Sequence, residues 1–179
     1  MDDNTKRVMF SSAKEEWGTP QNLFDNLNKE FNFTLDVCAL EENHKCDNYF
    51  TPETDGLSQQ WIGSCWQNPP YGKTISQWIE KAYLESLHGT RTVCLIPART
   101  DTKYFHEYCM KASEIRFVKG RLKFGDATNS APFPSIIVVF EPYNKPFPDI
   151  YTYDPNNPFY NVYRALPIYF SAVEPFTFG

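Results

Sequence analysis

Four consecutive residues near the middle of the chain, Asn68-Pro69-Pro70-Tyr71, combine rigid hydrogen-bond acceptors with an aromatic ring. Proline lacks an N–H and has a fixed φ, so the two prolines stiffen the backbone and present their carbonyl oxygens as acceptors. The side-chain oxygen of Asn68 is a second kind of acceptor, and the ring of Tyr71 can stack on a heterocycle. Two acceptors that converge on one point suit an exocyclic amino group, which has two N–H donors.

This arrangement can activate a ring-conjugated amine, which is a poor nucleophile because its lone pair is delocalised into the ring. Hydrogen bonds from both amine protons favour a pyramidal nitrogen and stabilise the charge that develops in the transition state. Direct attack on the sulfonium methyl group of S-adenosylmethionine then needs neither a covalent intermediate nor a metal. The alternative is a rigid turn without a chemical role, which four residues alone do not exclude.

The elements around these four residues favour the chemical interpretation. Cys65–Gln67 reads as a short strand, and Ile75–Leu87 has the spacing of an amphipathic helix. Because prolines do not continue a central strand, the tetrad is expected to form a loop at the strand's end. Thr19 is expected to cap a further helix, with Pro20 at its first position. In all, the pattern predicts helices at 21–31, 75–87 and 101–111 and strands at 33–38, 65–67, 91–96, 115–118 and 135–140.

Alternating strands and helices predict one α/β domain over residues 1–179, with ligands at the carboxyl ends of the strands. The polar segment 1–16 is expected to be flexible. The loop 119–134 is long enough to suggest a functional role. Residues 141–179 are rich in proline and aromatic residues, and are expected either to cover the core or to form a partner surface.

Two acidic residues are candidates for cofactor binding. Asp36 ends a predicted strand, where a carboxylate can reach the polar groups of a cofactor, although a turn-capping role fits equally well. The glycine-rich turn that usually follows such a strand is missing after Asp36. Asp55, in Asp55-Gly56, either ends a neighbouring strand or is a solvated turn residue.

Composition excludes several classes of protein. No apolar run approaches the length of a membrane span and the N-terminus is not a signal peptide, so we expect a cytoplasmic protein. The five cysteines are expected to be free thiols. Cys38, His44 and Cys46 lack the spacing of a zinc site, so no metal is expected.

The net charge of −5 counts against a DNA-binding protein, because such proteins contact phosphates through Lys and Arg. An acidic chain can nevertheless bind DNA where its basic residues cluster. One cluster is present, formed by Arg99, Lys103, Lys119, Arg121 and Lys123.

Seven sequence blocks between residues 15 and 140 resemble, in content and order, the phage-type DNA N6-adenine methyltransferases (Dam-like family). The blocks are Trp17-x-Thr19-Pro20 with Leu23-Phe24, Leu35-Asp36-Val37-Cys38-Ala39, Asp55-Gly56-Leu57 with Trp61, Asn68-Pro69-Pro70-Tyr71-Gly72, Leu95-Ile96-Pro97-Ala98-Arg99-Thr100-Asp101, Gly120-Arg121-Leu122-x-Phe124 and Ala131-Pro132-Phe133-Pro134-Ser135. Seven blocks in one order are far more specific than the tetrad alone. Gln67 departs from the family, where a cysteine is frequent, and the tail from Glu141 matches nothing in it.

The resemblance implies a class I S-adenosylmethionine-dependent methyltransferase sheet (Rossmann-like), mostly parallel with a terminal antiparallel hairpin. It implies methyl transfer from S-adenosylmethionine to the N6 amino group of adenine in double-stranded DNA, within a bacterial host cell. The target base lies inside a duplex, so it must be flipped out. The implied roles are Trp17, Thr19, Pro20, Asp36 and Asp55 for the cofactor, Asn68, Pro69, Pro70 and Tyr71 for the target base, and Arg99, Lys119, Arg121 and Lys123 for DNA.

Three other functions remain open at this point. Cytosine N4 methylation poses the same chemical problem to the same tetrad. Methylation of a protein glutamine would replace the base by an amide. A nucleic-acid-binding module with a degenerate site would belong to a different class, and saturable binding of S-adenosylmethionine would argue against it.

Overall fold

The computed structural model describes residues 17–125, 129–142, 148–153 and 156. The segment 1–16, predicted to be flexible, and most of the tail 141–179 lie outside the described residues. The described elements, in chain order, are α2 (Gln21–Phe31), β1 (Leu35–Asp36), β2 (Ser64–Gln67), α3 (Ile75–Leu87), β3 (Arg91–Pro97), α4 (Lys103–Glu107), the 3-10 helix η2 (Cys109–Lys111), β4 (Glu114–Val118), β5 (Ser135–Phe140) and β6 (Asp149–Tyr153).

A six-stranded mixed sheet organises these elements in the order β1-β2-β3-β5-β4-β6. The pairs β1–β2, β2–β3 and β4–β6 are parallel, whereas β5 is antiparallel to both β3 and β4. Five strands therefore run in one direction and β5 alone is reversed. The expected α/β class is confirmed, and β4 and β5 form the expected antiparallel hairpin.

The hairpin does not end the sheet, which is a correction to the sequence-based expectation. Asp149–Tyr153 adds the edge strand β6 alongside β4, in parallel. Part of the tail from Glu141 is thus a strand of the sheet. No strand was predicted there because Asp-Ile-Tyr-Thr-Tyr stands alone in a stretch rich in proline and asparagine.

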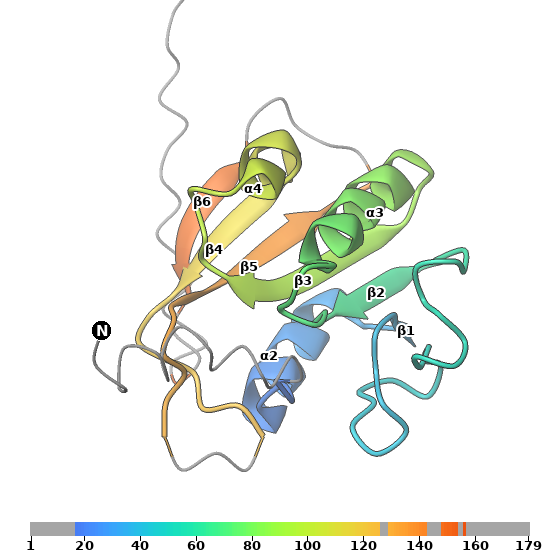
Figure 1. Ribbon diagram of the computed structural model, residues 1–179, viewed down its shortest axis with the longest axis horizontal. Coiled ribbons are helices and arrows are strands. Elements are labelled where there is room, and N and C mark those ends of the chain that lie inside the picture. Colours follow the sequence, from blue (N-terminus) through green and yellow to red (C-terminus); the bar gives the residue numbers. More distant parts are fainter. Residues whose placement is uncertain (1–16, 126–128, 143–147, 154–155, 157–179) are drawn as a thin grey trace, which may run out of the picture.

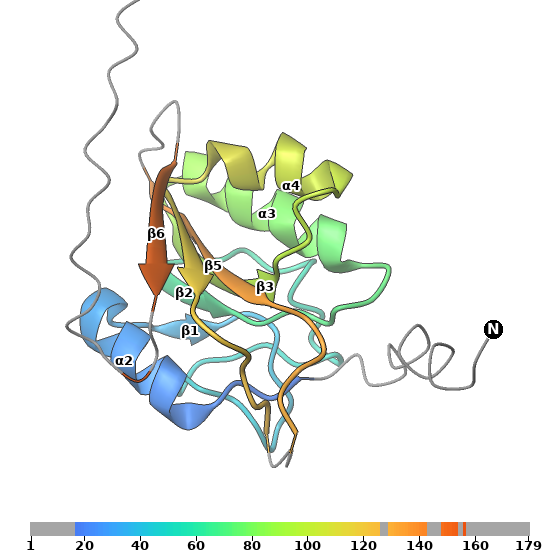
Figure 2. The same ribbon diagram turned by 90° about the vertical axis from the view of Figure 1, so that its left-hand side faces the viewer.

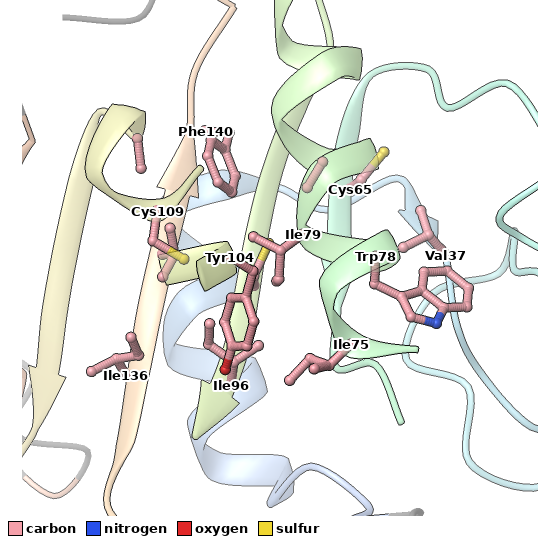
Figure 3. Close-up of a cluster of buried hydrophobic side chains, with 14 of the residues drawn as sticks. Val37, Cys65, Ile75, Trp78, Ile79, Ile96, Tyr104, Cys109, Ile136 and Phe140 are labelled. Carbon is pink, nitrogen blue, oxygen red and sulfur yellow. The ribbon is translucent and has the colours of Figure 1, made fainter. Parts of the chain in front are cut away.

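Helices cover both faces of the sheet (Figures 1 and 2). Helices α3 and α4 pack on one face, and α2 packs on the other. On the α3/α4 side, Ile79, Ile96 and Phe140 belong to one cluster of buried side chains (Figure 3). On the α2 side, a second cluster includes Leu27 and Val139. Alternate side chains of β5 supply both clusters, as expected for a central strand that is buried on both faces.

Two predicted helices differ in detail from the structure. Pro20, and not Thr19, is the N-cap residue of α2, and no side chain caps this helix. The helix predicted at 101–111 is divided into α4 and η2, which meet at Tyr108. Helix α3 spans the residues predicted for it.

Candidate functional site

The loops that follow β1, β2, β3 and β4 all lie at one end of the sheet, because these four strands run in the same direction. In an open α/β sheet this carboxyl end is where ligands bind. The loop after β1 begins at Val37 and the loop after β2 begins at Asn68. Between these two loops and the segment 17–19 lies a cavity of about 320 Å³.

The cavity has mostly apolar walls with a few polar groups, as small-molecule sites usually do. Of the predicted residues, Trp17, Thr19, Asp36, Asp55, Asn68 and Pro70 line it. Pro20, Pro69 and Tyr71 are not among its lining residues. The lining side chains that the sequence reasoning did not select include Asn43, Lys45, Phe50, Pro52, Leu57, Thr74 and Trp78.

Asp36 is a buried carboxylate at the end of β1, with 3% of its surface exposed. Its Oδ1 accepts a hydrogen bond from the Cys38 N–H at 3.3 Å, and its Oδ2 accepts one from the Lys45 N–H at 3.0 Å. Burial raises the pKa of Asp36 to about 6, although both backbone hydrogen bonds oppose this rise. Asp36 therefore has the loop-capping role considered from sequence, and it also lines the cavity, while its role in cofactor binding stays a prediction.

Asp55 does not end a strand. It lies in a turn with a positive φ of 50°, and its Oδ1 accepts a hydrogen bond from the Leu57 N–H at 3.2 Å. The next residue, Gly56, packs so tightly that an added Cβ would lie 2.1 Å from the Val37 carbonyl oxygen. This turn brings the exposed Asp55 to the rim of the apolar part of the cavity.

Phe50 and Trp78 line the cavity, together with the aromatic residues Trp17 and Trp66. Trp78 comes from α3 and is 8% exposed, and it stacks at 6.2 Å on Trp61. Trp61 is held in turn by a hydrogen bond from its Nε1 to the Gly56 carbonyl oxygen, at 2.8 Å. These contacts fix the Trp78 side chain in the cavity wall.

Both polar ends of the Asn68 side chain are held by the protein. Its Nδ2 donates a hydrogen bond to the Trp17 carbonyl oxygen, and its Oδ1 accepts one from the Tyr71 hydroxyl at 2.7 Å. The Tyr71 hydroxyl also lies 3.3 Å from the Leu95 carbonyl oxygen. An amide oxygen has two lone pairs, so Asn68 Oδ1 keeps one for a further donor.

The ring of Tyr71, which was predicted to stack on the target base, packs against other rings of the protein and does not line the cavity. Its ring makes edge contacts with Phe124 at 6.1 Å and Phe133 at 5.6 Å. Trp17 contacts the same two rings, at 5.4 and 5.2 Å. These four rings, which we call the aromatic cluster, join the segment 17–19, the tetrad and the loop 119–134.

The predicted basic residues also lie at the carboxyl end of the sheet, in the loops after β3 and β4. Arg99, Lys119, Arg121 and Lys123 are all exposed. In the second loop, the side chains of Leu122 and Phe124 are buried and alternate with the exposed Arg121 and Lys123. The loop is therefore anchored by apolar side chains while its charges face solvent.

Two negative findings concern the described residues. They contain no group of three or more His, Cys, Asp or Glu side chains placed to hold a metal ion. None of their helices is both long and apolar enough to cross a membrane. All five cysteines are free, which confirms the prediction of unpaired thiols.

Comparison with known proteins decides the family. The profile of the DNA N-6-adenine-methyltransferase (Dam) family matches residues 6–159, which include every element and site residue described above. The chain belongs to this family. The resemblance of the seven sequence blocks to the Dam family is thereby confirmed.

Two phage relatives of this Dam-family chain carry the same description, and a third relative is a putative methyltransferase. It is 34% identical over 147 residues to the DNA N-6-adenine-methyltransferase of Haemophilus phage HP1, covering 77% of this chain and 85% of that protein. It is 29% identical over 114 residues to the DNA N-6-adenine-methyltransferase of Escherichia phage T1, covering 62% of this chain and 48% of that protein. A putative methyltransferase of Escherichia coli strain K12, YfdM, is 35% identical over 65 residues, covering 32% of this chain and 71% of that protein.

Proposed function

We propose that this chain transfers a methyl group from S-adenosylmethionine to the N6 amino group of an adenine in double-stranded DNA. One observation carries the proposal. Asn68 and Pro70 of the tetrad open into the same cavity as the buried Asp36, at the carboxyl end of the sheet. A site that accepts an amine thus adjoins a site of suitable size and chemistry for the methyl donor.

S-adenosylmethionine fits the cavity residues. The aromatic side chains of Phe50 and Trp78 suit its adenosine group, and the exposed Asp55 can accept hydrogen bonds from hydroxyl groups. The buried carboxylate of Asp36, together with Trp17 and Thr19, suits its cationic amino-acid end. When bound, this cofactor supplies an electrophilic methyl group.

The tetrad would hold and activate the target amine. Asn68 Oδ1 and the Pro69 carbonyl oxygen accept the two N–H groups of adenine N6, which stabilises charge that develops on the nitrogen. The hydrogen bonds to the Trp17 carbonyl and from the Tyr71 hydroxyl hold the Asn68 amide in one orientation. Reaction then requires little reorganisation of the protein, which is how fixed hydrogen-bonding groups accelerate a reaction.

The target adenine must leave the duplex to reach this site. Arg99, Lys119, Arg121 and Lys123 are exposed around the same end of the sheet and would contact the DNA backbone and base edges. We also propose the class I methyltransferase fold, because five strands run in one direction with one reversed strand inserted between β3 and β4.

Incubation with mixed-sequence duplex DNA and methyl-labelled S-adenosylmethionine, followed by nucleoside analysis, tests the proposed function. N6-methyladenine is the expected product. If N4-methylcytosine forms instead, the target of the site is cytosine. Label in a protein fraction would indicate methylation of a protein glutamine. Absence of label together with absence of S-adenosylmethionine binding would indicate a degenerate binding module.

A further inference from the structure

Among the described residues, the cavity is lined by three charged side chains, of which Asp36 and Asp55 are acidic and Lys45 is the one cation. Lys45 belongs to the loop after β1, nine residues beyond Asp36 in the sequence, and sequence reasoning gave it no role. Its side chain is half-buried. A lysine that lines a ligand cavity can bind an anionic group of the ligand.

Lys45 and Asp36 form a pair of opposite charges at one place in the cavity wall. The Lys45 backbone N–H donates to Asp36 Oδ2 at 3.0 Å, and the two side-chain charges are close enough to affect one another. They do not form a salt bridge. Asp55 belongs to a different turn, whose glycine packs on Phe50 and Trp78. The charges of Asp36 and Lys45 are thus supplied by the loop after β1, whereas the turn of Asp55 packs on Phe50 and Trp78.

The Lys45 ammonium group is oriented by α2. Its Nζ donates to Gln21 Oε1 at 2.7 Å, and Gln21 Nε2 donates in turn to Asp25 Oδ1 at 2.8 Å. An ammonium group has three N–H donors, and Gln21 accepts only one of them. Burial lowers the pKa of Lys45, while the charges of Asp36 and Asp25 oppose that change. An anion in the cavity would satisfy the remaining donors.

We propose that Lys45 binds the carboxylate of the amino-acid end of S-adenosylmethionine while Asp36 faces its ammonium group. This inference rests on the proposed function, since it takes S-adenosylmethionine as the methyl donor. The amino-acid end is a zwitterion, and a buried ion is expensive unless a partner of opposite charge is provided. The Asp36–Lys45 pair provides one partner for each charge, so the site selects a donor with an intact amino-acid end.

Calorimetry with two ligands and two proteins tests the pairing directly. The ligands are S-adenosylmethionine and its decarboxylated analogue, and the proteins are wild type and Lys45→Met. A hydrogen bond to a charged group contributes about 1.5–3 kcal/mol, so Lys45→Met should weaken S-adenosylmethionine binding roughly 10- to 100-fold. The affinity for the decarboxylated analogue should hardly change, because its missing carboxylate has no contact to lose.

Lys29→Met is the matched control, since Lys29 is an exposed residue of the last turn of α2 and does not line the cavity. It should leave both affinities unchanged. Circular dichroism verifies folding of each variant, and Lys45→Gln, which removes the charge but keeps a polar side chain, replaces Lys45→Met if that variant does not fold.

Equal losses for both ligands, or no loss for either, would overturn the role of Lys45 while leaving the proposed function intact. Failure of the wild-type protein to bind S-adenosylmethionine would overturn the proposed function as well. Calorimetry measures binding alone, so these outcomes are separable from any effect on methyl transfer.

Discussion

At the scale of single residues, the carboxamide of Asn68 is the group on which the proposed chemistry depends most. It is held by a main-chain carbonyl on one side and a phenol hydroxyl on the other, which come from segments far apart in the sequence. Its remaining lone pair therefore points in a direction set by the fold. The part of the cavity that we propose for the cofactor does not depend on that lone pair.

Asn68→Ala is expected to lower the rate of methyl transfer by about 10²–10³, the usual effect of removing one transition-state hydrogen bond. S-adenosylmethionine affinity should stay close to that of wild type. Steady-state kinetics and calorimetry measure the two quantities. Asn68→Asp, which keeps an acceptor oxygen but loses the N–H to Trp17, should retain more activity than Asn68→Ala. Near-normal turnover in Asn68→Ala would remove this residue from the mechanism.

Asp36 makes the stability of the protein depend on pH in a defined direction. Burial raises its pKa from an ordinary 3.8 to about 6, so the folded protein favours the protonated carboxyl group. Its contribution to stability is fully present below pH 3.8 and is lost as pH rises through about 6.

Asp36→Asn cannot ionise and should lack this dependence. Relative to the variant, the free energy of unfolding of wild type should fall by on the order of 3 kcal/mol between pH 4 and pH 7. Denaturant unfolding at several pH values gives the comparison. His44 is close enough to lower the pKa of Asp36, so both proteins are also measured with His44→Gln. Parallel pH profiles for wild type and variant would refute the prediction.

Among the site residues, those predicted from sequence are the ones whose chemistry is visible in a short motif or at a strand end. Asn68, Asp36 and Thr19 are of this kind, and all three line the cavity. Lys45 and Phe50 were missed, because they lie in an irregular loop without periodicity that folds back beside β1. Its only strand-like contact is the isolated bridge between Asp36 and Tyr49.

At the scale of elements, helices and strands with clear apolar periodicity were predictable from sequence, whereas the two edge strands of the sheet, β1 and β6, were not predicted correctly. Ile75–Leu87 and Ser135–Phe140 match their predicted ranges because apolar spacing alone defines a helix on a sheet or a buried strand. Leu35–Asp36 is shorter than predicted, since the chain turns away after pairing with two residues of β2. The edge strand Asp149–Tyr153 depends on pairing with β4, which local sequence does not encode.

The turn around Gly56 is an element that tolerates no side chain. An alanine Cβ would lie 2.1 Å from the Val37 carbonyl oxygen, 3.2 Å from Trp78 Cη2 and 3.3 Å from Phe50 Cβ. Gly56→Ala is expected to cost about 1–3 kcal/mol of stability, as overpacking usually does. It should also weaken S-adenosylmethionine binding, because the displaced residues line the cavity.

Thermal unfolding and calorimetry test both effects of Gly56→Ala. Gly89→Ala is the comparison, because a Cβ there meets no atom within 4 Å although φ is +97°. It should cost stability through backbone strain but leave cofactor affinity unchanged. Wild-type affinity in Gly56→Ala would mean that the turn does not shape the binding site.

The loop 119–134 presents Arg121 to solvent and is anchored by its apolar residues. Arg121→Ala is expected to weaken DNA binding with little effect on cofactor affinity. If the side chain contacts only phosphate, affinity should fall for all sequences and the salt slope should drop by about one unit. If it reads a base edge, the loss should be about 1–3 kcal/mol and confined to the preferred site.

Titration of specific and scrambled duplexes at several salt concentrations distinguishes these two roles of Arg121. Lys29→Ala is the control. Lys29 is also a cation, but it lies in the last turn of α2, just before the chain enters β1, and not in a loop at the carboxyl end of the sheet. Arg121→Ala should lower the affinity for DNA, whereas Lys29→Ala should leave it close to that of wild type. Equal binding by wild type and Arg121→Ala at every salt concentration would assign Arg121 to ordinary surface.

At the scale of the whole molecule, the segment 17–19 joins the parts of the site. It lines the cavity, its Trp17 carbonyl holds Asn68, and the Gly18 carbonyl accepts a hydrogen bond from the Gly125 N–H at 2.7 Å. A bound cofactor would therefore contact the segment 17–19, and bound DNA would contact the loop 119–134 that is hydrogen-bonded to it. This arrangement also explains how a chain with a net charge of −5 can approach DNA, since the candidate basic residues lie in loops at this end of the sheet.

We expect S-adenosylhomocysteine to raise the affinity for DNA by about fivefold or more, which corresponds to the lower end of typical coupling energies. Thermodynamic linkage requires that DNA raise S-adenosylhomocysteine affinity by the same factor. Fluorescence anisotropy and calorimetry measure the two factors. Trp17→Ala, which removes the ring contacts to Phe124 and Phe133, should reduce both factors equally. If neither ligand changes the affinity of the wild-type protein for the other, the segment 17–19 does not couple the two binding sites.

The reversed strand β5 has a consequence for the order in which the chain folds. It lies between β3 and β4 and pairs with both, yet it is the last of the three to be synthesised. Until Ser135–Phe140 leaves the ribosome, β3 has an unpaired edge and β4 has no link to the rest of the sheet. Such an edge is a template for wrong pairing with other chains. The two halves of the molecule, and with them the site at their common end, can therefore join only after residue 140 has been made.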